Sequence, residues 1–396
     1  MSLLKEPSRR LASVNPLNNP KVRSVLVQAL VLLAVVALFW MVIDNTVHNL
    51  QRQNVATGFG FLDKPAGFGI VFSLVEYSEQ STYGRALLVG FLNTLLVAVI
   101  GIVVATVLGL TLGVARLSSN WLIAKLATIY IETLRNIPLL LQIFFWYFAV
   151  LRTLPGPADS LTFLDILFIN NRGFSVPSFS FGGGRGDVLA AFGLGLVLAL
   201  FGHVYAKRLR RSGMRVPALL KLRALLPLLL PVMVFFALGL PLHVDWPVLN
   251  RFGYEGGWAL IPEFVALVLA LSTYTAAFIA ENVRSGIQAV SHGQTEAARA
   301  LGLREGKILR LVIVPQALRI IIPPLTSQYL NLTKNSSLAV AIAYPDLVSV
   351  FSGTVLNQTG QAVEVIAITM TIYLSLSLFT SLLMNLYNRR MALVER

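Results

Sequence analysis

The chain has 396 residues, of which 56% are hydrophobic and only 13% are charged. Soluble domains carry about 25% charged residues, so this composition excludes an ordinary water-soluble protein. Cysteine is absent, which also excludes disulfides, thiolate metal sites and a cysteine nucleophile.

Eight apolar runs follow one another along the chain, and most approach the roughly 20 residues that cross a bilayer core. We expect spans at about 24–44, 87–113, 137–153, 187–206, 224–243, 259–281, 318–342 and 362–385. Prolines interrupt the third and the seventh, at Pro138, Pro323 and Pro324. The polar, basic segment before the first run shows no cleavable signal pattern. The predicted fold class is all-α, a polytopic membrane protein of about eight transmembrane helices.

The net charge of +14 is distributed as a membrane topology predicts rather than as a nucleic-acid surface. With a cytoplasmic N-terminus, most Lys and Arg fall in cytoplasmic segments, which is the positive-inside bias. The densest basic run, residues 207–223, holds seven cations and no acid, and we interpret it as a topology determinant beside anionic lipid. We therefore expect both termini in the cytoplasm, contact with the lipid bilayer and no nucleic-acid partner.

Two segments between the expected spans, residues 46–84 and 154–186, are rich in glycine and carry scattered aromatic residues. This composition is typical of surface loops or of a linker rather than of a folded domain. No strand-to-helix context surrounds these glycines, so we expect no phosphate site there.

A polar helical stretch, residues 293–319, separates two apolar segments. Ser291 and Gln294 have the spacing of a capping box at a helix start. Gly302 followed by Leu303 fits a helix end with a left-handed glycine and an apolar residue behind it. The sequence therefore predicts a short helix that ends at Gly302.

Small and apolar residues share one face of this short helix: Ala297, Ala300 and Leu301. A second helical segment is expected from near Arg304 toward Pro315. The glycine-to-lysine stretch 302–307 is not a nucleotide-binding loop, because it lacks the required spacing and the Ser or Thr after the lysine. The stretch is therefore either a surface for a partner or an ordinary connecting loop on the lipid headgroups.

Five residues of this stretch match the spacing of the EAA loop of ATP-binding-cassette importer permeases: Glu296, Ala297, Ala298, Gly302 and Pro315. Val312 and Val314 stand where that family usually has Ile and Leu. The resemblance implies that this loop contacts an ATPase.

Further blocks resemble the polar-amino-acid branch of the family, at residues 90–118, 130–148, 276–287 and 315–342. Residues 343–351 and 356–370 are similar to the larger permease subunits of general L-amino acid transport systems of Gram-negative bacteria. Together the blocks cover most of residues 87–390. More than a hundred residues separate the second block from the third, where short members of the branch have few.

The resemblance implies an amino acid transport subunit with a type I importer permease core in the bacterial inner membrane. Its expected partners are a second homologous permease, two cytoplasmic ATPase subunits and a periplasmic amino-acid-binding protein. No catalytic residue, cofactor or metal is expected. The implied domains are a tail, first span and outer loop (1–86) and an importer domain (87–390). An added segment of two spans (about 154–255) interrupts the importer domain, and the coupling loop covers about 288–315.

Polar side chains inside spans are costly and usually face a bundle interior or a water-filled cavity. We consider eight of them candidates for the substrate path: Asn93, Thr94, Gln142, Tyr274, Gln328, Asn331, Lys334 and Asn335. Ser272 and Thr275 belong to the same group. The alternative role of the amides and hydroxyls is hydrogen bonding between helices, and that of Lys334 is snorkelling to the membrane surface.

Two acid–base pairs occur at i, i+3 spacing, Glu132 with Arg135 and Glu281 with Arg284. We predict local ion pairs there, and a network that joins the two is possible.

Two other classes of protein remain open. An ion-coupled secondary transporter or channel usually places acids near the bilayer midplane, whereas the acids here fall near span edges. A membrane enzyme needs a catalytic constellation, but the four histidines lack metal-ligand spacing and no G-x-S-x-G motif occurs.

Overall fold

The computed structural model describes residues 20–52, 57–181, 185–212, 214, 217, 220, 222–239, 242–251 and 253–391. Helices dominate it. The α-helices are α1 (Pro20–Arg52), α2 (Tyr83–Arg116), α3 (Trp121–Asn136), α4 (Leu139–Phe144), α5 (Arg185–Arg211), α7 (Leu226–Ala237), α8 (Pro262–Gln288), α9 (His292–Ala300), α10 (Glu305–Ile308), α11 (Val314–Asn335), α12 (Leu356–Thr359) and α13 (Ala362–Met391). The 3₁₀ segments are η2 (Phe59–Asp63), η4 (Pro157–Asp159), η5 (Leu222–Leu225) and η7 (Ser336–Ile342), and the π segments are η3 (Phe145–Leu151), η6 (Leu309–Ile313) and η8 (Val348–Val355).

Within the described residues, 6 helices are long and apolar enough to cross a membrane, or up to 7 if a bent pair counts as one span. The six are Val22–Val42, Tyr83–Arg116, Gly186–Leu209, Pro262–Gln288, Glu305–Ile342 and Ala362–Asn388. They cover six of the predicted spans and confirm a polytopic, mainly helical membrane protein. The other two predicted spans differ in form.

The third predicted span, 137–153, is not a straight helix. It is the second arm of a bent pair, in which α3 is followed by α4 and η3 at an angle of 108°. Ile137 is extended because it precedes Pro138, and the helix must stop there. The Gln142 side chain donates to the carbonyl oxygens of Leu134 (2.8 Å) and Ile137 (2.9 Å), which satisfies backbone groups that the break leaves free.

The fifth predicted span, 224–243, is a shorter apolar helix, Leu222–Ala237, and its apolar run continues into a strand. This helix packs against α5 as a hairpin. Gly195 permits the close contact, because a Cβ atom there would lie 2.7 Å from the Cα atom of Pro227.

The interpretation of residues 154–186 as a linker was wrong, because they hold four short strands. One antiparallel sheet has four strands in the order β1 (Leu161–Phe163), β2 (Leu167–Asn170), β3 (Gly173–Val176) and β8 (Trp258–Leu260). Two further sheets have two strands each. β4 (Ser178–Phe181) pairs with β5 (Leu242–Asp245), and β6 (Val248–Asn250) pairs with β7 (Gly253–Glu255). β8, which pairs with β3, and β5, which pairs with β4, follow the α5–α7 hairpin in the chain. Sequence periodicity over such short strands could not reveal those pairings.

The core of the bundle lies along α2 and α8, which pack together over most of their length. Two glycines of α2 allow this approach. A Cβ atom added at Gly109 would lie 2.6 Å from the Cβ atom of Ile279, and one added at Gly113 would lie 2.6 Å from the Cβ atom of Val283. Small residues serve the same purpose at many membrane helix interfaces. α11 packs on both α2 and α8, and α13 packs on α11.

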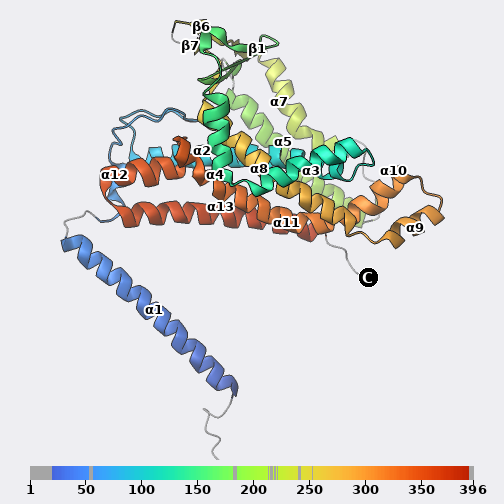
Figure 1. Ribbon diagram of the computed structural model, residues 1–396, viewed down its shortest axis with the longest axis horizontal. Helices are drawn as coiled ribbons and strands as arrows, with labels where there is room; N and C mark the ends of the chain where they lie inside the picture. The colour runs from blue at the N-terminus through green and yellow to red at the C-terminus, as the bar shows by residue number, and fades with distance from the viewer. Residues whose placement is uncertain are drawn as a thin grey trace, which may run out of the picture.

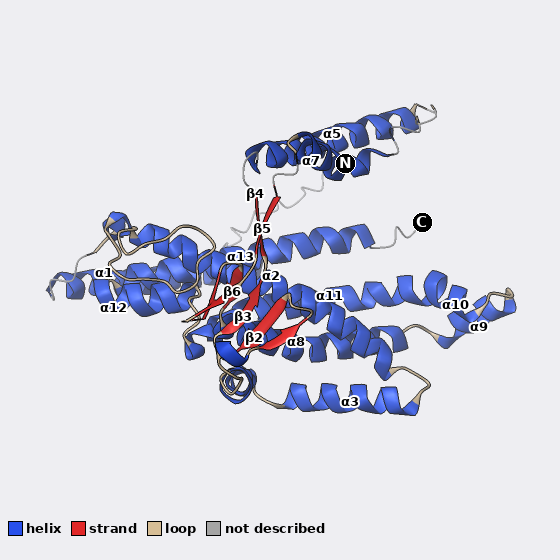
Figure 2. Cartoon of the chain, turned by 90° about the horizontal axis from the view of Figure 1, so that it is seen from above, coloured by secondary structure: helices blue, strands red, loops and turns tan. Residues whose placement is uncertain are grey.

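The two ends of the bundle carry different structures (Figures 1 and 2). α9 and α10 project from one end, and α12 lies at the other. α1 diverges from the bundle in Figure 1, but the chain after it returns to the start of α13. There the Gly58 amide donates to Glu364 Oε1 (2.6 Å), and Gln361 Nε2 donates to the Gly58 carbonyl oxygen (3.3 Å).

Candidate functional site

The polar loop begins with helix α9, and Ser291 is its N-cap residue. The predicted capping box is wrong, because the Ser291 side chain makes no capping hydrogen bond. Gln294 instead accepts from Gln316 Nε2 of α11 at 3.4 Å. The amide thus joins the loop helix to the long helix that follows it.

The predicted end of α9 is confirmed. Gly302 has φ +72°, in the left-handed region. The Leu303 amide donates to the Ala298 carbonyl oxygen (3.2 Å), and the Gly302 amide donates to that of Arg299 (2.8 Å), which is the Schellman pattern. No atom lies within 4 Å of a Cβ placed on Gly302, so glycine is required there by backbone conformation and not by space.

One side of α9 is open to a partner. Ala298 is buried, whereas Glu296 and Ala297 are exposed. At the end of the helix, Leu301 is 81% exposed. An exposed Leu beside exposed small residues is a surface suited to close packing of another protein.

The second helical segment begins at Glu305, close to the predicted position, but it does not end near Pro315. A single helix continues from Glu305 to Ile342. The π turn η6 directly precedes α11, and Pro315 follows that turn at the start of α11. Arg299 and Glu305 form an ion pair across the Gly302 turn, with 2.6 Å between Nε and Oε1.

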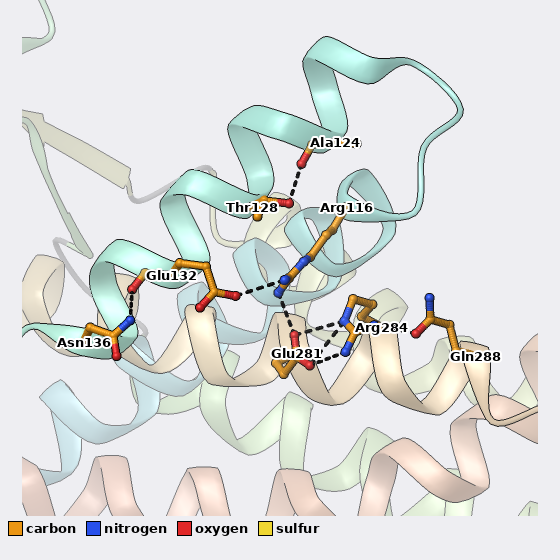
Figure 3. Close-up of polar contacts among 8 residues, drawn as sticks. All are labelled: Arg116, Ala124, Thr128, Glu132, Asn136, Glu281, Arg284 and Gln288. Atoms are coloured by element: carbon orange, nitrogen blue, oxygen red, sulfur yellow. Dashed lines mark hydrogen bonds and ion pairs between the residues drawn. The ribbon is translucent and has the colours of Figure 1, made fainter.

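An ionic network joins three helices beside the loop (Figure 3). Arg116 at the end of α2 bonds Glu132 of α3 (2.9 Å) and Glu281 of α8 (2.7 Å). Glu281 also forms an ion pair with Arg284 at 2.5 Å, as predicted. The Arg284 guanidinium in turn donates a hydrogen bond to the Gln288 side-chain oxygen. Arg116 was missed by sequence reasoning, although a basic residue at the end of a span was the available signal.

The predicted pair between Glu132 and Arg135 does not form in the described part of the chain. Glu132 bonds Arg116 instead, because α3 runs back alongside α2 and α8. The Arg135 guanidinium lies over the ring of Phe278, 5.3 Å from its centroid. It therefore lies next to a ring that lines the pocket described below.

A pocket of about 260 Å³ opens between α8 and α11. Its lining residues are Tyr274, Thr275, Phe278, Gln328, Asn331 and Asn335. Four of the eight path candidates therefore meet in one place, together with Thr275 from the wider group. Phe278 was not predicted, since an apolar ring in a span carries no distinctive sequence signal.

Asn93 and Thr94 lie elsewhere, in the packing between α2 and the segment before η8. Asn93 Nδ2 donates to the carbonyl oxygens of Phe72 and Pro345, both at 2.9 Å. The Thr94 hydroxyl accepts from the Leu347 amide at 3.0 Å. These side chains are buried and join α2 to Phe72 and to residues 345–347.

The remaining path candidates also lie outside the pocket lining. Gln142 holds the bend after α3, and Lys334 is exposed on α11. Ser272 is buried and donates weakly to the Gly101 carbonyl oxygen at 3.5 Å.

A second pocket, of about 430 Å³, lies at the base of α9. Its lining residues are Ile287, Gln288, Val290, His292, Thr295 and Ile313. It lies between the end of α8, the start of α9 and η6. Among the described residues, no group of three or more His, Asp or Glu side chains is placed to hold a metal ion.

A multi-span bundle with a protruding two-helix loop at one end and a polar pocket between α8 and α11 defines a membrane transport component. The chain belongs to the family of binding-protein-dependent transport system inner membrane components, whose model matches residues 101–393. This membership confirms the predicted importer permease fold and a role in transport rather than catalysis.

Three relatives match nearly the whole chain. The putative amino-acid ABC transporter permease protein YhdX of Escherichia coli is 55% identical over 96% of both chains. The general L-amino acid transport system permease protein AapQ of Rhizobium johnstonii is 53% identical over 96% of this chain and 94% of its own. The glutamate/glutamine/aspartate/asparagine transport system permease protein BztB of Rhodobacter capsulatus is 42% identical over 94% of this chain and 95% of its own.

Proposed function

We propose that the chain is the permease subunit of an ATP-driven amino acid importer and forms, with a second homologous permease, the path for L-amino acids. The names of its three relatives support an amino acid substrate. The single observation that carries the mechanism is one continuous helix, Glu305–Ile342. It begins at the polar loop and carries three residues of the pocket between α8 and α11.

The pocket has the chemistry to hold an amino acid. Gln328, Asn331 and Asn335 each offer a carbonyl acceptor and an amide donor, which suits the carboxylate and the ammonium of a zwitterion. The rings of Tyr274 and Phe278 add apolar wall. A volume of about 260 Å³ is slightly below the range of about 300–1,000 Å³ for sites of drug-sized ligands, so it suits a smaller solute.

The loop is proposed to bind one of two cytoplasmic ATPase subunits through the exposed side of α9. Glu296, Ala297, Ala298, Gly302 and Pro315 are its proposed coupling residues. ATP-driven movement of that ATPase would displace α9, and the Gly302 turn and the Arg299–Glu305 pair would pass the displacement to the long helix. About 23 residues separate Glu305 from Gln328, which is roughly 35 Å of helix. Rigid-body coupling of this kind joins two sites through one element.

Location and partners complete the proposal. The inner membrane is the compartment named for the family, and the positive-inside bias favours cytoplasmic termini and a cytoplasmic α9 loop. A periplasmic amino-acid-binding protein would deliver substrate at the opposite end of the bundle. Residues 154–255 are proposed to be an insertion outside the importer core, since α5 and α7 pack mainly on each other.

Uptake by proteoliposomes that contain the chain, its second permease, the ATPase and the binding protein tests the proposal. Gln328→Leu and Asn331→Leu should each lower amino acid uptake at least about tenfold, since a hydrogen bond to a charged group contributes about 1.5–3 kcal/mol. Ser327→Ala is the matched control, because Ser327 is exposed on the same helix and does not line the pocket. Undiminished uptake in both leucine variants would refute the site.

The same vesicles distinguish the rival class of transporter. An ion-coupled carrier would move amino acids when the chain alone is reconstituted and an ion gradient is applied. An importer permease should show no such uptake, and should transport only with the ATPase and ATP.

A further inference from the structure

The four-stranded sheet has one strongly apolar face. Side chains alternate between faces along a strand, and residues paired across strands share a face. Leu161 pairs with Ile169, Ile169 with Phe174, and Phe174 with Leu260. Phe163 and Trp258, two positions along their strands, join the same face. One side of the sheet is therefore apolar from its first strand to its last.

The helical bundle already covers part of this face. Phe174 and Leu260 pack against the hydrophobic core of the bundle, where β3 contacts α8. The rest of the face extends beyond that contact. Leu161 is 53% exposed, Phe163 63% and Trp258 59%. Exposed apolar area of this kind, continuous with an existing apolar interface, indicates that something else covers it.

The opposite face has a different character. Thr162, Asn170 and Ser175 lie on it, by the same pairing. The hairpin of β6 and β7 covers part of it, with the rings of Phe168 and Tyr254 4.8 Å apart. The sheet is thus two-sided, with polar groups and a covering hairpin on one side and uncovered apolar side chains on the other.

Short connections hold the sheet close to membrane-spanning helices. Only Ile261 separates β8 from α8, so the last residue of β8 lies within about 7 Å of the start of that span. β4 ends at Phe181, and α5 begins at Arg185. In Figure 1 the strands gather at one edge of the bundle, away from α9 and α10. Because α8 runs from β8 toward α9, the sheet lies beside the membrane surface on the side opposite the loop.

We propose that the apolar face of this sheet is a lipid-contact surface, on which Leu161, Phe163 and Trp258 enter the headgroup and upper acyl region. Three observations favour lipid over a soluble partner. The face continues the surface that packs on the bundle, and its connections keep it beside the spans. It also carries a Trp, a residue enriched where proteins meet the membrane–water interface. The sheet thereby anchors the inserted segment to one leaflet.

Site-directed spin labelling tests this surface directly. The chain has no cysteine, so a single cysteine in the full chain gives a single label. Phe163→Cys and Thr162→Cys form a matched pair, because both side chains are exposed on the edge strand β1 but on opposite faces. Trp258→Cys and Ala259→Cys form a second pair on β8, also both exposed.

The labelled chain is reconstituted in vesicles of phosphatidylethanolamine and phosphatidylglycerol. Collision with dioxygen, which concentrates in the bilayer, is compared with collision with a water-soluble nickel chelate. The ratio of the two should be severalfold higher at 163 than at 162, and severalfold higher at 258 than at 259. Equal ratios within both pairs would overturn the proposal. Labels at 163 and 258 that are immobile and shielded from both probes would also overturn it, because protein and not lipid would then cover the face.

Discussion

At the residue scale, two glycines of the loop show whether backbone conformation or lack of space requires a glycine. A Cβ atom added at Gly302 or at Gly306 would have no neighbouring atom within 4 Å. Only Gly302 has a positive φ, +72°, whereas Gly306 lies inside α10. A side chain in the left-handed region costs on the order of 1 kcal/mol or more. The two positions should therefore respond differently to substitution.

We predict that Gly302→Val misorients α9 and sharply lowers transport while the chain remains in the membrane. Co-purification of the ATPase and substrate-stimulated ATP hydrolysis measure the effect. Gly306→Ala is the control, and should leave both values near those of the parent, because alanine favours a helix. Normal coupled hydrolysis in Gly302→Val would show that the loop is only a connector.

Asp346 is a buried carboxyl group in the segment between the two C-terminal spans. The Ser349 amide donates to its Oδ1 (2.8 Å), and the Tyr373 hydroxyl to its Oδ2 (3.3 Å). Burial nevertheless raises the pKa of Asp346 to about 7, because these hydrogen bonds only partly offset the loss of water. Below about pH 7 the protonated form is thus favoured in the folded state.

The sign of the pH effect follows from linkage. Between about pH 4, where an unfolded aspartic acid titrates, and about pH 7, the folded protein holds a proton that the unfolded chain has lost. The stability that Asp346 contributes should fall as pH rises through this window and level off above it. Thermal unfolding in detergent at several pH values measures this, and Asp346→Asn should flatten the slope. An unchanged slope in that variant would assign the pH dependence to other groups.

Single residues were predictable where their chemistry is local. The left-handed Gly302 and the amides Gln328, Asn331 and Asn335 follow from short spacings, and the structure places those amides in one pocket. Arg116 was not predictable in this way. Its two carboxylate partners come from helices that lie 16 and 165 positions away in the chain.

At the element scale, the close packing of α2 on α8 depends on glycine. A Cβ atom at Gly109 would lie 2.6 Å from the Cβ atom of Ile279, a distance that requires the helices to separate. We predict that Gly109→Ala destabilises the folded chain by about 1–3 kcal/mol, as overpacking usually does. The recovery of monodisperse protein after heating in detergent measures the loss.

The control for that substitution is Gly193→Ala. Gly193 lies in α5, and a Cβ atom there has no neighbour within 4 Å. Alanine should therefore be tolerated or slightly stabilising, since it favours the helix. Equal losses in both variants would show that glycine matters for the membrane helices in general and not for the α2–α8 contact.

Helices were predictable from the sequence where one apolar run corresponds to one helix. The α3–α4 bend was missed because a break at Pro138 splits the apolar run over two short arms, and neither arm alone has the length of a span. The strands were missed because each has only three or four residues. Two of the pairings, β3 with β8 and β4 with β5, join segments on either side of the α5–α7 hairpin, and nothing within a short window of sequence encodes such contacts.

At the scale of the whole molecule, the two ends of the helical bundle differ. The α9 loop is at one end and α12 is at the other, and the strands gather at one edge of the bundle between them (Figures 1 and 2). The pocket lies between α8 and α11. The helix Glu305–Ile342 runs from the loop past the pocket, so in the proposed mechanism it is the element that connects a displacement at the loop to the pocket. This arrangement works for import only if the loop faces the cytoplasm.

That orientation gives the last prediction. Single cysteines can be introduced at Ser212, Ser291 and Asn357, which are all exposed, in a chain that has none of its own. A membrane-impermeant thiol reagent added to intact spheroplasts should label only position 357, because the positive-inside bias places the other two in the cytoplasm. Permeabilised cells, in which all three should react, control for access. Labelling at 291 from outside would reverse the topology and remove the physical basis for an ATPase at α9.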